Sequence, residues 1–431
     1  MKKKSGLFLV LLVLTTVALV SAGGAKAADD DVTREVFKGT NKTTVKVVMQ
    51  AGGYRQEALA AVFQEYINET GNSVELRWVP NTSWAEYFNK IQTMIASGDA
   101  PDCFMVAIEG FEIFRSRDLL EPLDPYFNKY PAQKAILDGE HPRLQAPFIV
   151  DGKLYGLGIE WNNVVAHVNL NILNEAGLPM PPANWNYDTF LEYAKKMTYT
   201  RPDGTKVYGT SIPDYYFAAS AWLFNNGASF MNNNWTRSTI NSPEAVEVFQ
   251  FFQDLIYKYE VAPRPPVETE QLFMNDQIGL YYAGRWPVRT FTDSGFSAVD
   301  VVRLPTNKSP VAIFGSGCFP VLKASKNKDA AFLLASKLSS LKSQEILLTA
   351  NSIPTNVQAM DNMVKNSTFP KNTAVFRTDA DVARAVESPN FYADIEVAFN
   401  RALSKILANE STPKAALDTL AREIDELIAN R

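Results

Sequence analysis

TVKVVMQ, at residues 44–50, is a β-branched run typical of a buried strand, and it begins the stretch of sequence that decides the fold. Apolar residues then recur at helical spacing over 58–69, VELRWV at 74–79 alternates like a second strand, and 85–97 has another apolar helical face. CFMVAI at 103–108 is continuously apolar, as expected for a strand buried on both faces. This β-α-β-α-β order predicts an α/β fold, in which helices cover a parallel sheet.

The loops after these three strands are the first candidates for a binding site. In open α/β sheets, ligands bind outside the carboxyl ends of the strands. Here the three loops begin at Gln50, Pro80 and Glu109. Side chains in these loops are therefore expected to meet at one edge of the sheet.

The rest of the chain alternates between helical and strand patterns without an internal repeat. Helices are predicted over 189–197, 217–224, 243–259, 329–341 and 415–428, and strands over 277–282, 301–304 and 312–322. Asp188 is the predicted cap of the first of these helices, and Ser242 of the third. Residues 29–41 are polar and charged and are predicted to be a loose leader. The roughly 400 residues beyond position 27 exceed what one core usually holds, so two domains are expected.

Residues 1–27 have the three parts of a secretory signal peptide. Lys2, Lys3 and Lys4 give a positive start, residues 7–20 are almost wholly apolar, and Ala25-Lys26-Ala27 is a cleavage site between small residues. A membrane anchor needs about 20 apolar residues, so cleavage is favoured over anchoring. No lipobox cysteine stands at the cleavage site, which favours a mature protein that is free in a periplasm.

The charge balance argues against some partners. Cleavage after Ala27 removes four of the 42 lysines and arginines and none of the 47 acids, which leaves 38 basic residues and a net charge near −9. An acidic protein of this kind is unsuited to nucleic acid or to an anionic membrane. Because no coiled-coil or repeat pattern is present, a monomer is expected.

The two cysteines, Cys103 and Cys318, could form one disulfide in an oxidising compartment. Each lies in a strand-like run, however, and a disulfide between strands needs demanding geometry. Two buried, unbonded thiols are therefore favoured over a disulfide.

The sequence has no catalytic motif. Of its two histidines, His141 and His167, the second lies in an apolar strand pattern typical of a core histidine. No pattern of a zinc protease, serine hydrolase, phosphate-binding loop or calcium loop occurs, so no catalytic residue, metal site or cofactor is expected. Asp118, Glu121 and Asp124 could be glycosidase carboxylates, but they surround a Leu-Pro turn, and that turn explains them better.

Aromatic residues stand beside amides and glycines at several predicted loop starts. Examples are Trp161-Asn162-Asn163, Phe224-Asn225-Asn226-Gly227 and Gly284-Arg285-Trp286. A sugar needs flat apolar surfaces for its C–H faces and fixed donors and acceptors for its hydroxyls, and such clusters supply both. Trp78 and Trp185 are expected to be core residues instead.

Several blocks of the sequence resemble the type 1 extracellular solute-binding proteins of carbohydrate ABC importers, the relatives of maltose-binding protein. The most specific blocks are residues 91–102 (IQTMIASGDAPD) and 169–185 (NLNILNEAGLPMPPANW). The others are residues 119–125 (LLEPLDP), 152–156 (GKLYG), 273–286 (FMNDQIGLYYAGRW), 324–330 (ASKNKDA) and 352–355 (SIPT). The resemblance covers nearly all of the mature chain. The chain departs from many members of that family in lacking the lipobox cysteine.

The resemblance implies a two-lobed periplasmic-binding-protein fold, similar to class II, with the ligand cleft between two α/β lobes. Crossings near Trp161, Ala312 and Thr355 would give an N-lobe of 44–161 and 312–356 and a C-lobe of 162–311 and 357–431. The family closes on its ligand by hinge bending, so the site should draw residues from both lobes. The implied partners are a carbohydrate-like small molecule and the membrane permease of an ABC importer.

Twelve residues are candidate ligand contacts by position within the matched motifs. They are Gln50, Tyr54, Trp84, Glu109, Glu160, Trp161, Asn162, Trp222, Asn225, Trp286, Gly315 and Gly317. The two glycines would let a ligand approach bare backbone closely. Glu109 and Glu160 would accept hydrogen bonds from sugar hydroxyls and would not be catalytic acids.

Two alternatives stay open. The same fold could bind a polyol, a glycerol phosphate ester or a peptide. A phosphate would call for clustered Arg or Lys, and only Arg285 is a candidate cleft cation, which favours a neutral ligand. The second alternative is a secreted glycosidase, which would turn its ligand over.

Overall fold

The computed structural model describes residues 32–51, 53–80, 83–350 and 352–430, without the side chains of 53–55 and 350. The predicted signal peptide, residues 1–27, lies outside the described residues. Among the helices that are described, none combines the length and the apolar character needed to cross a bilayer.

The first sheet contains strands β1 (Thr33–Phe37), β2 (Thr44–Gln50), β3 (Ser73–Val79) and β4 (Cys103–Phe104), in the order β1-β3-β2-β4. β2 runs parallel to both β3 and β4, as the sequence predicts. Residues 29–41, predicted as a loose leader, instead contain β1, which pairs antiparallel with β3 along its whole length. The polar composition of β1 is consistent with a strand at the edge of a sheet, where most side chains are exposed.

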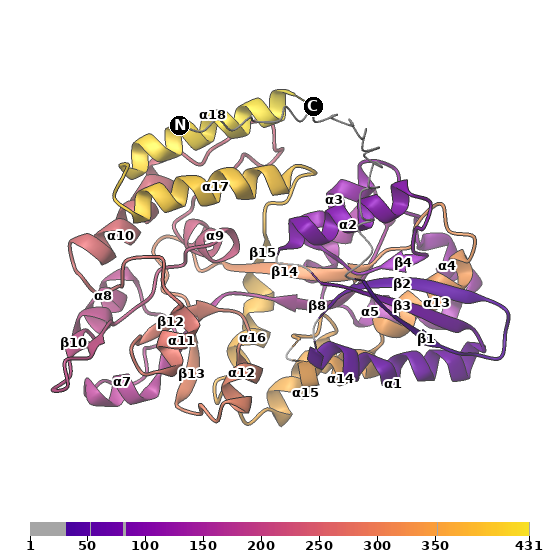
Figure 1. The fold of residues 1–431 in the computed structure, drawn as a ribbon, viewed down its shortest axis with the longest axis horizontal. Helices are drawn as coiled ribbons and strands as arrows, with labels where there is room; N and C mark the ends of the chain where they lie inside the picture. Colours follow the sequence, from indigo (N-terminus) through magenta and orange to yellow (C-terminus); the bar gives the residue numbers. More distant parts are fainter. Residues whose placement is uncertain (1–31, 52, 81–82, 351, 431) are drawn as a thin grey trace, which may run out of the picture.

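Two helices cover opposite faces of this sheet, α1 (Gly53–Thr70) and α2 (Trp84–Ala96) (Figure 1). Successive side chains of β2 point to opposite faces of the sheet and so pack against both helices. Val47 and its neighbours two residues away pack in one core cluster with α1, whereas Val48 packs in another with α2. A strand buried on both faces therefore explains the nearly continuous apolar run of β2.

The predicted strand over 103–108 is wrong in one respect, because the chain changes sheets within it. β4 pairs with β2, but β5 (Val106–Ala107) pairs with a distant strand, and helix α3 (Ile108–Arg115) starts immediately afterwards. Met105 lies at the change, with its backbone amide still bonded to the Val48 carbonyl at 2.9 Å. Glu109 consequently lies in the first turn of a helix, not in a loop.

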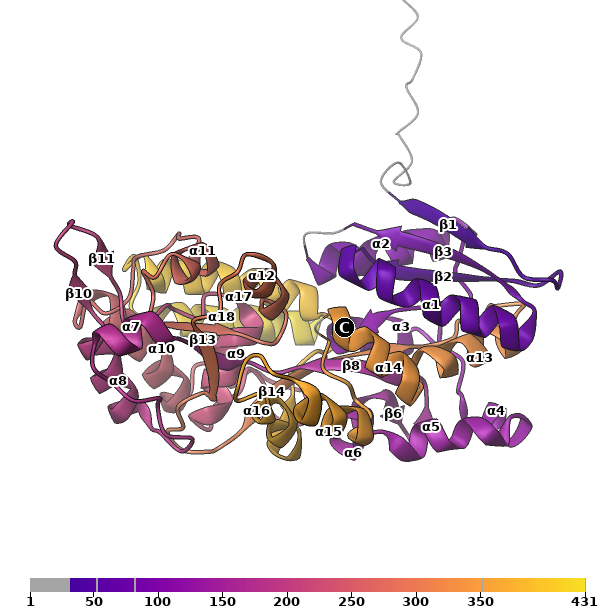
Figure 2. The ribbon, with the colours of Figure 1, turned by 90° about the horizontal axis from the view of Figure 1, so that it is seen from below.

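A long antiparallel pair of strands connects the two halves of the molecule. β8 (Leu157–Asn162) and β14 (Ala312–Phe319) run across its middle in Figure 1. The first sheet lies on one side with its helices, α13 (Lys328–Leu338) and α14 (Leu341–Leu347) among them, and α7 to α12 (within 170–293), α17 and α18 (within 392–429) lie on the other. β14 also pairs with β5 and, in parallel, with β15 (Ala383–Ala385). The two halves lie side by side in Figure 2 as well.

The second half is built on the sheet β12-β9-β13, from Leu280–Ala283, Val165–Asn169 and Val299–Arg303. Its larger helices are α8 (Tyr187–Lys196), α9 (Tyr216–Asn225), α10 (Pro243–Tyr257), α17 (Tyr392–Leu407) and α18 (Pro413–Ala429). The Ser242 cap of α10 is confirmed, since its hydroxyl accepts from the Ala245 amide. The predicted Asp188 cap of α8 is wrong. Asn186 caps that helix through the Thr189 amide, and Asp188 lies in its first turn.

The remaining elements are short or pack around these two sheets. They are α4 (Asp124–Lys129), α5 (Lys134–Gly139), α6 (Pro142–Gln145), β6 (Ile149–Val150), β7 (Lys153–Leu154), α7 (Leu170–Glu175), β10 (Tyr199–Thr200), β11 (Lys206–Val207), α11 (Thr269–Met274), α12 (Val288–Asp293), α13 (Lys328–Leu338), α14 (Leu341–Leu347), α15 (Val357–Asn366) and α16 (Ala374–Thr378).

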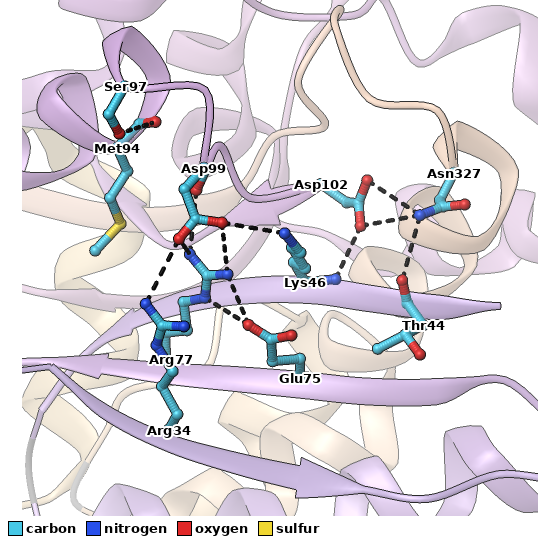
Figure 3. A network of polar contacts seen from close by, with 10 residues as sticks. All are labelled: Arg34, Thr44, Lys46, Glu75, Arg77, Met94, Ser97, Asp99, Asp102 and Asn327. Carbon is cyan, nitrogen blue, oxygen red and sulfur yellow. Dashed lines mark hydrogen bonds and ion pairs between the residues drawn. The ribbon is translucent and has the colours of Figure 1, made fainter. Parts of the chain in front are cut away.

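The ASGDAPD block forms a polar network that holds the first half together (Figure 3). Gly98 ends α2 with a positive φ of 83°, a conformation that glycine adopts without strain. Asp99 then accepts hydrogen bonds from Arg77 of β3 and Lys46 of β2, at 2.7 and 3.1 Å. Asp102 accepts from the Lys46 backbone amide at 2.8 Å and from Asn327 at 3.3 Å. The block therefore joins two strands to the segment that leads into α13.

The core predictions for single residues are confirmed. Trp78 and Trp185 are 1% and 2% exposed. Cys103 and Cys318 are buried free thiols. His167 is fully buried, its Nε2 lies 2.8 Å from the Gly284 carbonyl oxygen, and burial lowers its pKa to about 4.

Candidate functional site

A cavity of about 400 Å³ lies where β8 and β14 pass between the two halves. Nine of the twelve predicted residues line it: Gln50, Trp84, Glu109, Glu160, Trp161, Asn162, Trp286, Gly315 and Gly317. They come from the end of β2, the start of α2, the first turn of α3, the two crossing strands and the segment after β12. Residues distant in sequence thus converge on one hollow.

The floor of the cavity is one face of the crossing strands. Glu160 of β8 lies opposite Gly317 of β14, and Asn162 lies opposite Gly315. Side chains of directly paired residues share a face of a sheet, so Glu160 and Asn162 project on the side where β14 has no side chains. The two glycines leave room there, and a Cβ on Gly315 would lie 3.4 Å from Glu109 Oε1.

Trp161 borders the cavity, but its ring belongs to the opposite face of β8. It pairs with Ser316, and its neighbours Glu160 and Asn162 take the cavity face. The Trp161 side chain is 0% exposed. Its backbone amide also donates to the Ile353 carbonyl at 2.8 Å. Trp161 therefore helps to hold the crossing strand in place, and its ring is not open to a ligand.

Buried carboxylates give the cavity its electrostatic character. Glu109 is 6% exposed, and its Oε2 has no hydrogen-bond partner. Burial raises the pKa of Glu109 to about 7, and the charge of Glu396 contributes to the same shift. Glu396 itself accepts from the Tyr392 hydroxyl at 3.2 Å, and burial raises its pKa above the usual range. Polar acceptors are thus concentrated in this part of the wall.

Two serine hydroxyls hold Glu160 in place. The Ser352 hydroxyl donates a hydrogen bond to its carboxylate, and the Ser316 hydroxyl donates to its backbone carbonyl at 3.1 Å. Glu160 is 7% exposed. Its carboxylate is therefore positioned before any ligand arrives, which lowers the ordering cost of binding.

Aromatic rings form the remaining walls. Trp84 stacks on Phe88 of the same helix with ring centroids 5.7 Å apart. Trp286 is 40% exposed, and its ring lies so close to Gly284 that a Cβ there would be 2.2 Å from it. Phe217 lies over the Gly315 backbone. Tyr215 has a buried hydroxyl with no partner, and burial raises its pKa.

Three predicted residues are not brought to the cavity wall. Trp222 is 1% exposed within an aromatic cluster of Tyr187, Phe190 and Tyr282, and Asn225 is 2% exposed with its Oδ1 accepting from the Val311 amide. Helix α9 is covered on nearly every side, and its packing keeps both side chains away from the cavity wall. Tyr54 falls in α1, but its side chain lies outside the described residues.

Of the described lining residues, seven were not predicted from the sequence: Met105, Ala107, Tyr215, Phe217, Ser316, Tyr392 and Glu396. One signal was available. Tyr392 and Glu396 are four residues apart, so they share one face of α17. Tyr215 and Phe217 carried no comparable signal, because their approach to the cavity depends on how α9 packs.

The described part of the cavity wall has no positive side chain. Among its described lining residues there is no Lys, Arg or His. Arg285, the cation expected in the cleft, lines a different hollow. Within the described part of the chain, no cluster of His, Cys, Asp or Glu has the arrangement of a metal site. This arrangement can supply acceptors to hydroxyl groups and flat surfaces to C–H groups, and it disfavours an anionic ligand.

Comparison with known sequences finds relatives over the full length. A protein of Brucella abortus named as a binding protein is 23% identical, over 99% of this chain and 98% of its own length. The maltotriose-binding protein of Pyrococcus abyssi is 27% identical over 48% of this chain and 42% of its own. The galactooligosaccharide-binding protein of Bacillus subtilis is 23% identical over 63% of this chain and 66% of its own.

Solved structures agree with the two-lobed fold. An ABC substrate-binding protein from Listeria monocytogenes, in complex with cycloalternan, matches 90% of this chain and 100% of its own with a TM-score of 0.81 and 27% identity. A maltose-bound binding protein of T. maritima matches 89% and 100% with a TM-score of 0.75 and 20% identity. The sequence model of the bacterial extracellular solute-binding proteins matches residues 49–345, well over half of the chain. The chain therefore belongs to the bacterial extracellular solute-binding protein family.

Proposed function

We propose that this protein captures a neutral saccharide in the cavity between its lobes and delivers it unchanged to the membrane permease of an ABC importer. Relatives named for maltotriose and galactooligosaccharide support the ligand class, and the matched structure in complex with cycloalternan supports it further. The family supports the transport role.

The observation that carries the proposal is the composition of the cavity wall. Glu109, Glu160 and Glu396 offer oxygen acceptors, while Trp84 and Trp286 offer rings. A polyhydroxylated ligand can donate hydroxyl hydrogens to the carboxylates and lay its C–H face on a ring. The volume of about 400 Å³ lies within the range of small-molecule sites.

The lining residues also suggest how capture works. With an N-lobe of 44–161 and 312–356 and a C-lobe of 162–311 and 357–431, the cavity takes Glu109 from one lobe and Trp286, Tyr392 and Glu396 from the other. A ligand that contacts both lobes stabilises the closed form in proportion to those contacts. The closed monomer, free in the periplasm after removal of residues 1–27, would then be the form that the permease recognises.

Each of the two alternative functions predicts a different result. A glycerol phosphate ester would leave its phosphate facing carboxylates, which costs affinity. A glycosidase would use two of the carboxylates as an acid and a base and would consume its sugar. A binding protein returns the sugar intact, so recovery of the ligand discriminates between the two.

Isothermal titration calorimetry of the mature protein tests the proposal. Neutral mono-, di- and oligosaccharides, polyols and glycerol phosphodiesters would be titrated separately, and each sugar recovered afterwards by chromatography. We expect one-to-one binding of at least one neutral saccharide, with the sugar unchanged. Tighter binding of a phosphodiester than of every saccharide, or conversion of the sugar, would reject the proposal.

A further inference from the structure

A second hollow of about 400 Å³ lies between the segment after β12 and the helices α14 and α15. Among the described residues, its polar lining consists of Arg285, Glu345, Asn362, Asn366 and Ser367. None of these residues lines the sugar cavity. The proposed function therefore leaves this group of polar side chains without a role.

Arg285 is the unusual member of the group, because it is a buried cation that has no counterion among the described residues. It is 7% exposed. Its Nη1 donates to the Ser352 carbonyl at 3.3 Å, and its Nε has no partner. Among the described residues, no carboxylate charge contributes to the pKa of Arg285, whose shift comes from burial alone. Burial lowers the pKa of Arg285 to about 10, so it stays charged at neutral pH. A buried, unpaired charge costs several kcal/mol, which makes a missing anionic partner the simplest account of it.

The other lining residues restrict what that partner can be. Glu345 accepts from Asn362 Nδ2 at 2.6 Å, and its charge would repel a bare anion that filled the hollow. Asn366 is exposed on the last turn of α15, and Ser367 follows it. A ligand that carries a carboxylate at one end and hydroxyls at the other would satisfy Arg285 and Glu345 together.

From this geometry we infer that the hollow around Arg285 binds a hydroxylated carboxylate of the sugar-acid class. The guanidinium would receive the carboxylate, for which its planar donors are suited. Glu345 and the two asparagines would exchange hydrogen bonds with the hydroxyls. The ligand is either a free sugar acid or an acidic unit of a longer saccharide whose neutral part occupies the sugar cavity.

The hollow is connected to the sugar cavity by short contacts. Arg285 holds the Ser352 carbonyl, and the Ser352 hydroxyl holds the Glu160 carboxylate. The Arg285 backbone amide donates to Asn162 Oδ1 at 3.4 Å. Glu160 and Asn162 both line the sugar cavity. Occupation of one site should therefore change the ligand affinity of the other. This expected coupling rests on the proposed function, but the inferred binding of a sugar acid at Arg285 does not.

Calorimetric titration of the mature protein with D-glucuronate, D-glucose and inorganic phosphate tests the inference. We expect glucuronate to bind and Arg285→Met to weaken it about 10- to 100-fold, the cost of losing hydrogen bonds to a charged group. The matched control is Arg289→Met, one turn further on and 41% exposed, which should leave glucuronate binding unchanged. Arg285→Met should melt no lower than the wild type, since it removes an unpaired buried charge.

A second variant guards against misfolding of the first. Asn366→Asp places a negative charge at the exposed edge of the hollow and should weaken glucuronate binding without affecting glucose. If glucuronate and a neutral saccharide bind at the same time, the ligand of the hollow is a free sugar acid. If a disaccharide ending in glucuronate displaces both glucuronate and the neutral saccharide, the ligand is an acidic saccharide that spans the two sites.

Three results would overturn the inference: no glucuronate binding, glucuronate binding that survives both Arg285→Met and Asn366→Asp, or phosphate binding as tight as that of glucuronate. Any of these, with neutral saccharides still bound by the wild type, would leave the proposed function intact. Loss of saccharide binding altogether would instead reject the proposed function.

Discussion

The Arg77 guanidinium, with a side chain 2% exposed, donates a hydrogen bond to the Asp99 carboxylate at 2.7 Å. This contact joins the middle of the first sheet to the loop after α2, and hydrogen bonding to Arg77 lowers the pKa of Asp99 to about 2. The family-like ASGDAPD block therefore has a structural role in this chain (Figure 3), and none of its residues lines the cavity.

Asp99→Asn should destabilise the protein by about 1–2 kcal/mol, because it leaves the buried Arg77 with Glu75 as its remaining carboxylate partner. The expected loss of stability is small because the Asp99 side chain is 40% exposed, so solvent screens its charge. Urea unfolding of both proteins at pH 7 measures the difference. Asp329→Asn, which breaks the exposed pair with Lys129, is the control and should change stability by less than about 0.5 kcal/mol. Equal effects of the two substitutions would contradict the assigned role.

Glu109 predicts a pH-dependent difference between the wild type and Glu109→Gln. Its pKa is raised from 4.5 to about 7 in the folded state, so the wild type holds its proton more tightly when folded. This tighter proton binding adds its full contribution to wild-type stability below pH 4.5, and the contribution is lost as the pH rises toward 7. The free energy of unfolding of Glu109→Gln should therefore rise relative to that of the wild type by about 3 kcal/mol between pH 4.5 and 7. Above about pH 7 the difference between the two should stay constant. Unfolding free energies between pH 4 and 8 measure this, and a constant difference across the range would exclude a raised pKa.

Trp286→Ala should weaken saccharide binding by at least about 1 kcal/mol, if its ring stacks on the ligand. Trp235→Ala is a matched control, since Trp235 is 37% exposed against 40% for Trp286 and does not line the cavity. Calorimetry on both variants, with melting curves to establish folding, gives the comparison. Unchanged affinity in folded Trp286→Ala would remove this ring from the site.

Cys103 and Cys318 should be unreactive toward a thiol reagent in the native state. Both are fully buried, and burial raises the pKa of each thiol well above its usual range, which suppresses the thiolate. Titration with a chromogenic disulfide should release two equivalents only after denaturation, and a reductant should not lower the melting temperature. A drop in melting temperature with reductant would indicate a disulfide.

The sequence predicted the local elements well where one period dominates. The β-branched run of β2, the alternation in β3 and the helical spacing in α1 and α2 predicted the first sheet and the helices that cover it. The break at Met105 could not be predicted, because it depends on pairing between Val106 and Cys318, far apart in the chain. β1 was missed for a similar reason, since its polar sequence becomes a strand only beside β3.

In the candidate site, too, residues marked by local sequence were predicted, and residues whose position depends on packing were not. Gln50, at the end of a predicted strand, and Glu160, beside the crossing near Trp161 that the resemblance implied, were predicted as ligand contacts, and both line the cavity. Trp222 was not distinguishable by sequence from a wall residue, because only the packing of α9 decides which of its aromatic rings are enclosed. Glu396 could have been found from its spacing to Tyr392.

The antiparallel pair of β8 and β14 has a mechanical consequence. The strands that connect the two halves are also the floor on which Glu160 and Asn162 stand, and β14 is hydrogen-bonded along both of its edges. Rotation of one half against the other is then a torsion of the floor itself, concentrated where Gly315 and Gly317 add no side-chain resistance. A ligand that lay across these two strands would stiffen them, so binding and rotation of the halves would share a single torsional coordinate.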